Sequence, residues 1–107
     1  MPGFDFNTLM RQVRKMQEQA NAKQAELAET VRCEGKAGDG LVTVVVNGMR
    51  QLVSVKIDPK AVDPADVAML EDLVTAAANA ALAQASQKYE EEMSKVTGGM
   101  KIPGLTV

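Results

Sequence analysis

Residues 41–58 read LVTVVVNGMRQLVSVKID, and this stretch decides the fold because it carries the pattern of a β-hairpin. Asn47-Gly48 can adopt the left-handed backbone of a tight turn, and β-branched residues alternate on both sides of it. The alternating positions are Val42, Val44, Val46, Val53, Val55 and Ile57. A period of two around an Asn-Gly turn predicts two antiparallel strands whose valines share one face of a sheet.

The pairing register of this hairpin depends on the length of its loop. A two-residue loop and a four-residue loop both keep the two valine sets on one face of the sheet. The four-residue loop, residues 47–50, matches the two sets better and is the predicted one. The pairs expected on this register are Val42–Val55, Val44–Val53 and Val45–Leu52. The second face would then expose Leu41, Val45 and Leu52, so we expect it to carry part of a contact between subunits.

A first helix is predicted before the hairpin, over about residues 6–28, with Asp5 or Asn7 as its N-cap. Its apolar positions follow steps of four and three residues, which is a heptad pattern. These positions are Leu9, Val13, Met16, Ala20 and Leu27. An apolar stripe of this kind that stays exposed calls for a partner chain to cover it.

Residues 29–35 are predicted to form an edge strand, with Val31 and Cys33 facing inward. Residues 35–40, GKAGDG, invite comparison with phosphate-binding loops. Such loops need their glycines between a strand and a helix N-terminus. Here the glycines stand between two predicted strands, so we interpret the segment as a hairpin loop.

A second, long helix is predicted from Pro64 to about residue 96, with Asp63 as its capping acceptor and Gly98-Gly99 as its end. Such a helix would be roughly 50 Å long, whereas a compact domain of this size has a radius of gyration of about 13 Å. The start of the first helix and the end of the second should therefore lie near one another and project from the body. A symmetric homodimer is the simplest way to cover the apolar surface left exposed.

Composition excludes several classes of function. The 107 residues carry a net charge of −2, with no His, one Cys and three aromatic residues. Without His the commonest general base and metal ligand is absent, and no serine has a visible activating base, so we expect neither an active site nor a metal site. Cys33 has no disulfide partner in the chain. No signal peptide or membrane-spanning run is visible, and a cytoplasmic location is expected.

Charge is distributed unevenly along the chain. Residues 11–60 hold nine Lys/Arg and six acids, whereas residues 61–107 hold three Lys and seven acids. Arg11, Arg14 and Lys15 are spaced to lie near one face of the first helix, beyond the body of the domain, which suits contact with DNA phosphates. Alternatively, they pair with Glu18 and with the acidic residues 90–92 of the second helix.

Several segments, in this order, resemble the YbaB/EbfC family of bacterial nucleoid-associated proteins. They are LMRQ at residues 9–12, GDGLV at 38–42, NG at 47–48, VKIDP at 55–59, LEDLV at 70–74, NAA at 79–81 and MSKVTGGM at 93–100. The resemblance covers almost all of residues 7–105. It implies an α+β fold of the order α-β-β-β-α, in one domain spanning residues 1–107, that forms a tweezer-like homodimer.

The resemblance also implies a function. Members of the family bind double-stranded DNA largely without sequence specificity, alter its conformation in the nucleoid, and sometimes affect gene expression. It implies no catalysis, cofactor, membrane contact or small-molecule substrate. DNA contact is attributed in the family to projecting helices, which here means Arg11, Arg14 and Lys15, with Lys88 and Lys95 opposite.

One alternative function stays open from the sequence. The acidic second helix could clamp a basic partner protein, which would make the chain a protein-interaction module. Residues 1–5 and 99–107 are expected to be flexible ends in either case.

Overall fold

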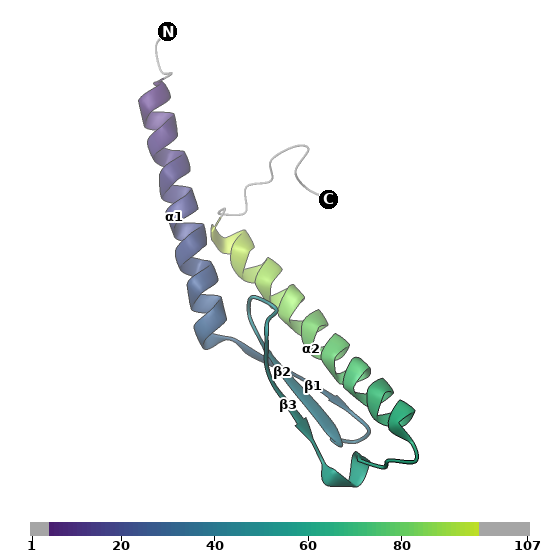
Figure 1. Cartoon of the computed structure of the whole chain (residues 1–107). Helices are drawn as coiled ribbons and strands as arrows, with labels where there is room; N and C mark the ends of the chain where they lie inside the picture. The colour runs from purple at the N-terminus through teal and green to yellow at the C-terminus, as the bar shows by residue number, and fades with distance from the viewer. Residues whose placement is uncertain (1–4, 97–107) are drawn as a thin grey trace.

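The computed structural model describes residues 5–96 and shows an α+β chain in the predicted order of elements (Figure 1). The elements are α1 (Phe6–Thr30), β1 (Arg32–Ala37), β2 (Val42–Asn47), β3 (Leu52–Ile57), η1 (Pro59–Ala61) and α2 (Val67–Val96). Asp5 caps α1, as expected, through a 3.0 Å hydrogen bond that its Oδ1 accepts from the Asn7 amide. The other residues of the expected flexible ends lie outside the described residues.

The three strands form one antiparallel sheet in the order β1-β2-β3, and α2 lies along β1 and β2 on one of its faces (Figure 1). The fully buried core joins the alternating valines of β2 to one row of small residues on α2. Its members are Val42, Val44, Val46, Ala77, Ala81 and Ala85. Because alanine is short, the helix backbone lies close to the sheet. Gly35 of β1 completes this contact, since a Cβ there would overlap the Ala77 carbonyl oxygen.

The predicted hairpin register is wrong by two residues. Val42 lies opposite Ile57 and Val44 opposite Val55, with a bulge at Val53 next to the Val46–Leu52 pair. A three-residue loop, closed by a hydrogen bond of 2.9 Å from the Asn47 amide to the Gln51 carbonyl, accounts for one residue of this shift, and the bulge at Val53 accounts for the other. The loop ends with Arg50 at a φ of 63°, a left-handed residue of the kind that three-residue hairpin loops use.

This register also moves the exposed apolar surface to the other face. Leu52 lies opposite Val46, on the face that α2 covers, and not opposite Val45 as predicted. The outer face is therefore mixed, since Val45 there is half-buried beside Ser54. The exposed apolar residues of β3 thus lie on the same face as α2, but at the β3 edge of the sheet, beyond the strands that α2 covers.

Three element boundaries also differ from the sequence prediction. The first strand begins at Arg32 instead of residue 29, because α1 continues to Thr30. Gly35 consequently lies within β1, and the left-handed turn is confined to residues 38–40. The second helix starts at Val67 instead of residue 64, because the Asp66 carboxylate caps it by accepting the Met69 amide at 3.2 Å.

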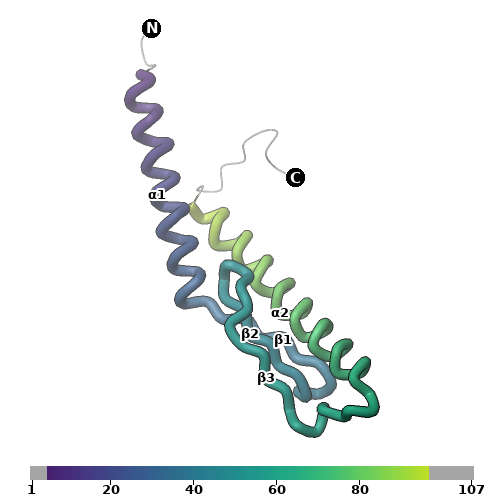
Figure 2. The backbone as a smooth tube through the Cα atoms, in the orientation of Figure 1, coloured from purple at the N-terminus to yellow at the C-terminus, as the bar shows by residue number. Residues whose placement is uncertain are grey.

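The molecule is elongated, as the helix lengths predicted. Its radius of gyration is 20.1 Å, against about 13 Å for a compact domain of this size. However, the expected meeting of the start of α1 with the end of α2 is wrong: α2 ends at Val96, beside Gln19 and Ala22 in the middle of α1 (Figure 2). Most of α2 is used along the sheet, so only its last turns reach α1.

Candidate nucleic-acid interface

The half of α1 that extends past the end of α2 is an isolated helix, which we call the α1 overhang (residues 6–18; Figure 1). Arg11, Arg14 and Lys15 are all exposed on it. Within residues 5–96 none of the three has an ion pair or a hydrogen bond through its side chain. The alternative prediction, that they pair with residues 90–92, therefore does not describe this structure.

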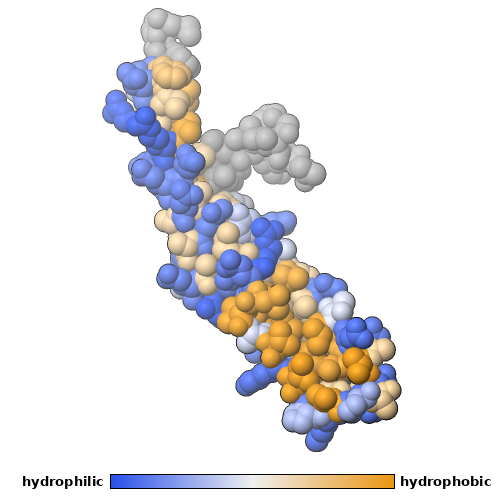
Figure 3. Space-filling view, viewed as in Figure 1, coloured by the Kyte–Doolittle hydropathy of each residue, from blue (hydrophilic) through white to orange (hydrophobic). Residues whose placement is uncertain are grey.

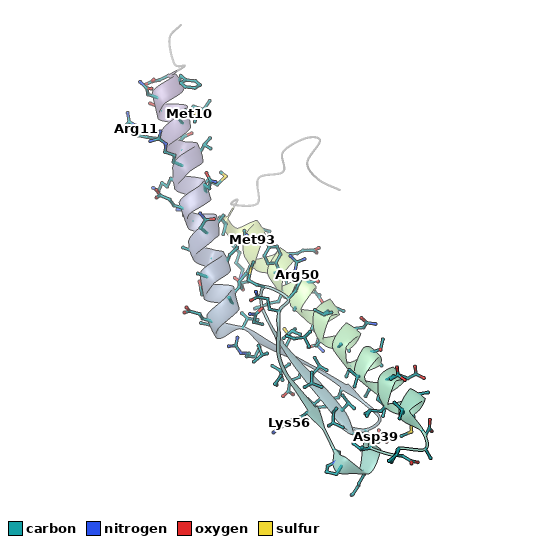
Figure 4. The ribbon with its side chains drawn as sticks, in the orientation of Figure 1. Met10, Arg11, Asp39, Arg50, Lys56 and Met93 are labelled. Carbon is teal, nitrogen blue, oxygen red and sulfur yellow. The ribbon has the colours of Figure 1, made fainter. Side chains whose placement is uncertain are left out.

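The three cations lie on the side of the overhang away from its apolar residues. At 100° per residue, their directions fall within a sector of about 100°, opposite Leu9 and Val13. Figure 4 shows Arg11 and Met10 projecting from different sides of α1, and Figure 3 shows the polar and apolar sides of the same helix. The overhang thus offers three cations on one polar face, to which phosphate groups have open access.

Lys88 and Lys95, the two cations predicted on the second helix, are placed differently. Both contact the carboxylate of Glu92, each at 3.2 Å from Nζ to Oε1. Lys23 of α1 reaches the same carboxylate, 3.0 Å from Nζ to Oε2. Glu92 therefore joins three lysines and two helices, and it is the buried charged residue where α1 meets α2. Lys88 and Lys95 are thus paired with a carboxylate, whereas among the described residues the three overhang cations are not.

A second set of contacts at the same place ties the hairpin loop to both helices. The Arg50 guanidinium lies over the Tyr89 ring, 4.5 Å from its centroid, and the Tyr89 hydroxyl accepts a 3.1 Å hydrogen bond from Gln24 Nε2. The Gly48 amide donates to the Leu27 carbonyl at 3.0 Å. We call this region, together with Glu92 and its lysines, the junction. It fixes the direction in which the overhang leaves the sheet.

Sequence reasoning missed the junction, because its members lie far apart in the chain. Glu92 is one of three consecutive glutamates, and nothing local distinguishes it from Glu90 or Glu91. The one available signal was the heptad position of Lys23, which interrupts the apolar stripe of α1. A lysine on a helix-packing face predicts an acidic partner on the facing helix.

The pKa of Glu92 is lowered to about 2 from its ordinary 4.5, first by Lys23 and then by Lys95 and Lys88. A lowered carboxylate pKa stabilises the folded state above pH 4.5, and this contribution disappears as the pH falls from 4.5 through 2. We expect the carboxyl ¹³C shift of Glu92 to titrate near pH 2, and Lys23→Met to raise that midpoint more than Lys95→Met does. A native midpoint close to 4.5 would contradict the ion-pair cluster.

Other classes of site find no support in the described part of the chain. No three His, Cys, Asp or Glu side chains gather where a metal ion could bind. Among residues 5–96, no helix combines the length and apolar character required to cross a membrane.

Comparisons with known proteins identify a family of DNA-binding proteins. The YbaB/EbfC DNA-binding family matches residues 1–100. A nucleoid-associated protein of Myxococcus xanthus is 52% identical over 106 residues, covering 99% of this chain and all of the relative. One from Clostridium kluyveri is 50% identical over 103 residues, covering 96% and 90%. The fold recurs in the crystal structure of the uncharacterized protein HP0035 from Helicobacter pylori, with a TM-score of 0.67 and 22% identity over 91% of this chain and 97% of that one.

The match over nearly the whole chain gives the class first: this is a DNA-binding protein. The chain belongs to the YbaB/EbfC DNA-binding family. Membership confirms the resemblance found in the sequence.

Proposed function

We propose that the chain works in the nucleoid, where it binds double-stranded DNA through phosphates and alters its conformation largely without regard to sequence. The observation that carries the proposal is the α1 overhang, whose Arg11, Arg14 and Lys15 have no protein partner among the described residues. Lys88 and Lys95 add a weaker contribution, since both share the Glu92 carboxylate. Relatives named as nucleoid-associated proteins support the cellular role.

We infer further that the working form is a homodimer that presents two overhangs like the arms of tweezers. The support is a continuous apolar surface beside the sheet (Figure 3). Its exposed residues on β3 are Leu52, Val53, Val55 and Ile57. A patch of this kind on an edge strand is unfavourable in water and typical of a subunit contact. A second copy is the simplest partner that supplies a matching apolar surface.

A charge placed in this apolar surface should separate the subunits. We expect Val55→Lys to raise the dimer dissociation constant at least ~100-fold, because burying two unpaired ammonium groups per dimer costs about 3 kcal/mol or more. Ser54→Lys is the matched control, since it adds the same charge to the outer face of the same strand. Sedimentation velocity across a dilution series measures both variants. Equal dissociation of the two, or none in either, would refute β3 as the contact.

DNA binding is tested by its salt dependence. Three cations per subunit neutralise about six phosphates per dimer, so log affinity should fall with log salt at a slope of roughly −5. Fluorescence anisotropy on two duplexes of unrelated sequence supplies the slope and the specificity together. A flat salt response, or tight binding to one duplex alone, contradicts the proposal. Clamping of a basic protein is less well supported, because Glu92 is already occupied by three lysines.

A further inference from the structure

The α1 overhang carries an apolar stripe that nothing covers among the described residues. Its members, all exposed, are Phe6, Leu9, Met10, Val13 and Met16. Five large apolar side chains along about 15 Å of one helix form a continuous strip, unlike the scattered apolar residues of ordinary surfaces. Phe6 is 63% and Val13 49% exposed, so a large part of this apolar area lies open to water.

The stripe continues the face by which α1 packs against α2. Further along the same face, Leu27 is buried and Ala20 half-buried, and Lys23 reaches across to Glu92. The stripe thus becomes exposed where α2 ends, with Val96 beside Gln19 and Ala22. The chain therefore leaves α2 close to the Met16 end of the exposed stripe.

We propose that residues 97–107 of the same chain dock on this stripe, so that they cover the apolar face of α1 before Gln19 as α2 covers it after Gln19. Eleven residues can span up to about 36 Å, whereas the helix from Gln19 back to Phe6 rises only about 20 Å. The segment reads TGGMKIPGLTV, with a single charged residue and four large apolar ones. Length, point of departure and apolar composition all match the uncovered surface.

The docking stiffens the part of α1 that carries the cations. Arg11, Arg14 and Lys15 lie on the opposite face of the overhang, so the docked segment leaves them open. An isolated helix of this length is marginal in water without packing. Cover on its apolar side therefore keeps the phosphate-binding face helical, which deepens the proposed function although the docking itself does not depend on DNA.

A tryptophan reporter tests the docking directly, since the chain has no native Trp. In Leu105→Trp we expect emission at a shorter wavelength than in the denatured chain, and adding Val13→Lys should return it to the longer wavelength. Glu18→Gln is the matched control, with the same change in net charge on the opposite face of α1, and should leave the emission short. The proposal is overturned if the Leu105→Trp chain without a further change already emits at the longer wavelength. It is also overturned if adding Val13→Lys and adding Glu18→Gln shift the emission equally.

A mixing experiment distinguishes docking on the chain's own stripe from docking on the stripe of a partner subunit. The Leu105→Trp/Val13→Lys chain is combined with a tenfold excess of the unaltered chain, allowing subunits to exchange. Docking within the chain predicts that emission stays at the longer wavelength, whereas a shift to the shorter wavelength shows docking between chains and refutes the proposal.

Independently, Ile102→Ser/Leu105→Ser should speed amide exchange of residues 9–16 about tenfold, which corresponds to 1.4 kcal/mol. Unchanged exchange rates would also contradict docking.

Discussion

Replacing Gly35 by alanine is expected to lower the stability of the fold by about 3 kcal/mol, at the upper end of what overpacking costs. A Cβ at this position would overlap the Ala77 carbonyl oxygen and lie 2.5 Å from the Ala81 amide nitrogen. Both are backbone atoms of α2, so no side chain can rotate away. The helix must move off the sheet, and the contact between its alanine row and the buried valines of β2 opens.

Thermal unfolding at fixed protein concentration measures this loss. A domain of this size loses about 4–8 °C per kcal/mol, so the midpoint should fall by roughly 15 °C. Gly40→Ala is the matched control, because that glycine has a φ of 89° but no atom within 4 Å of an added Cβ. Its cost is the strain of a left-handed alanine alone, about 1–2 kcal/mol. If Gly35→Ala melts no lower than Gly40→Ala, the close approach of α2 to β1 is wrong.

The difference between these two glycines illustrates what the sequence could and could not predict. Gly40 belongs to a left-handed turn, which a run of glycines predicts locally. Gly35 is required by a helix more than forty residues later, and no local pattern contains that contact. The alternation of Val42, Val44 and Val46 was likewise predictable, since period two is a property of the strand itself. The register was not, because it depends on Arg50 in a left-handed conformation, which contacts Tyr89 of α2.

The same division holds at the candidate interface. The spacing of Arg11, Arg14 and Lys15 predicts one helix face, and the structure places all three there without protein partners among the described residues. The sequence also showed Lys88 and Lys95 as equivalent cations. Only the three-dimensional structure distinguishes these two lysines from the overhang cations, because both contact Glu92, which is buried where two helices meet.

Removal of the overhang cations should have the largest effect on function. We expect Arg11→Ala/Arg14→Ala/Lys15→Ala to weaken DNA binding at least ~100-fold at low salt, and the slope of log affinity against log salt to shrink from roughly −5 to about −1. The loss should be equal on unrelated duplexes, because phosphate contacts carry no sequence information. Anisotropy titrations over a salt series measure affinity and slope together, and circular dichroism checks that α1 stays helical.

The control must separate position from net charge, which in this acidic chain is a real alternative. Lys36→Ala/Lys56→Ala/Lys60→Ala removes the same three charges from exposed positions at the sheet end of the molecule. If binding depends on the overhang, this variant keeps most of its affinity and a slope near −5. If instead a diffuse positive field attracts DNA, both triple variants lose affinity equally, and the overhang is not the binding site. Lys88→Ala removes a cation that already contacts Glu92, so the DNA affinity of this variant should lie between those of the unaltered chain and the overhang variant.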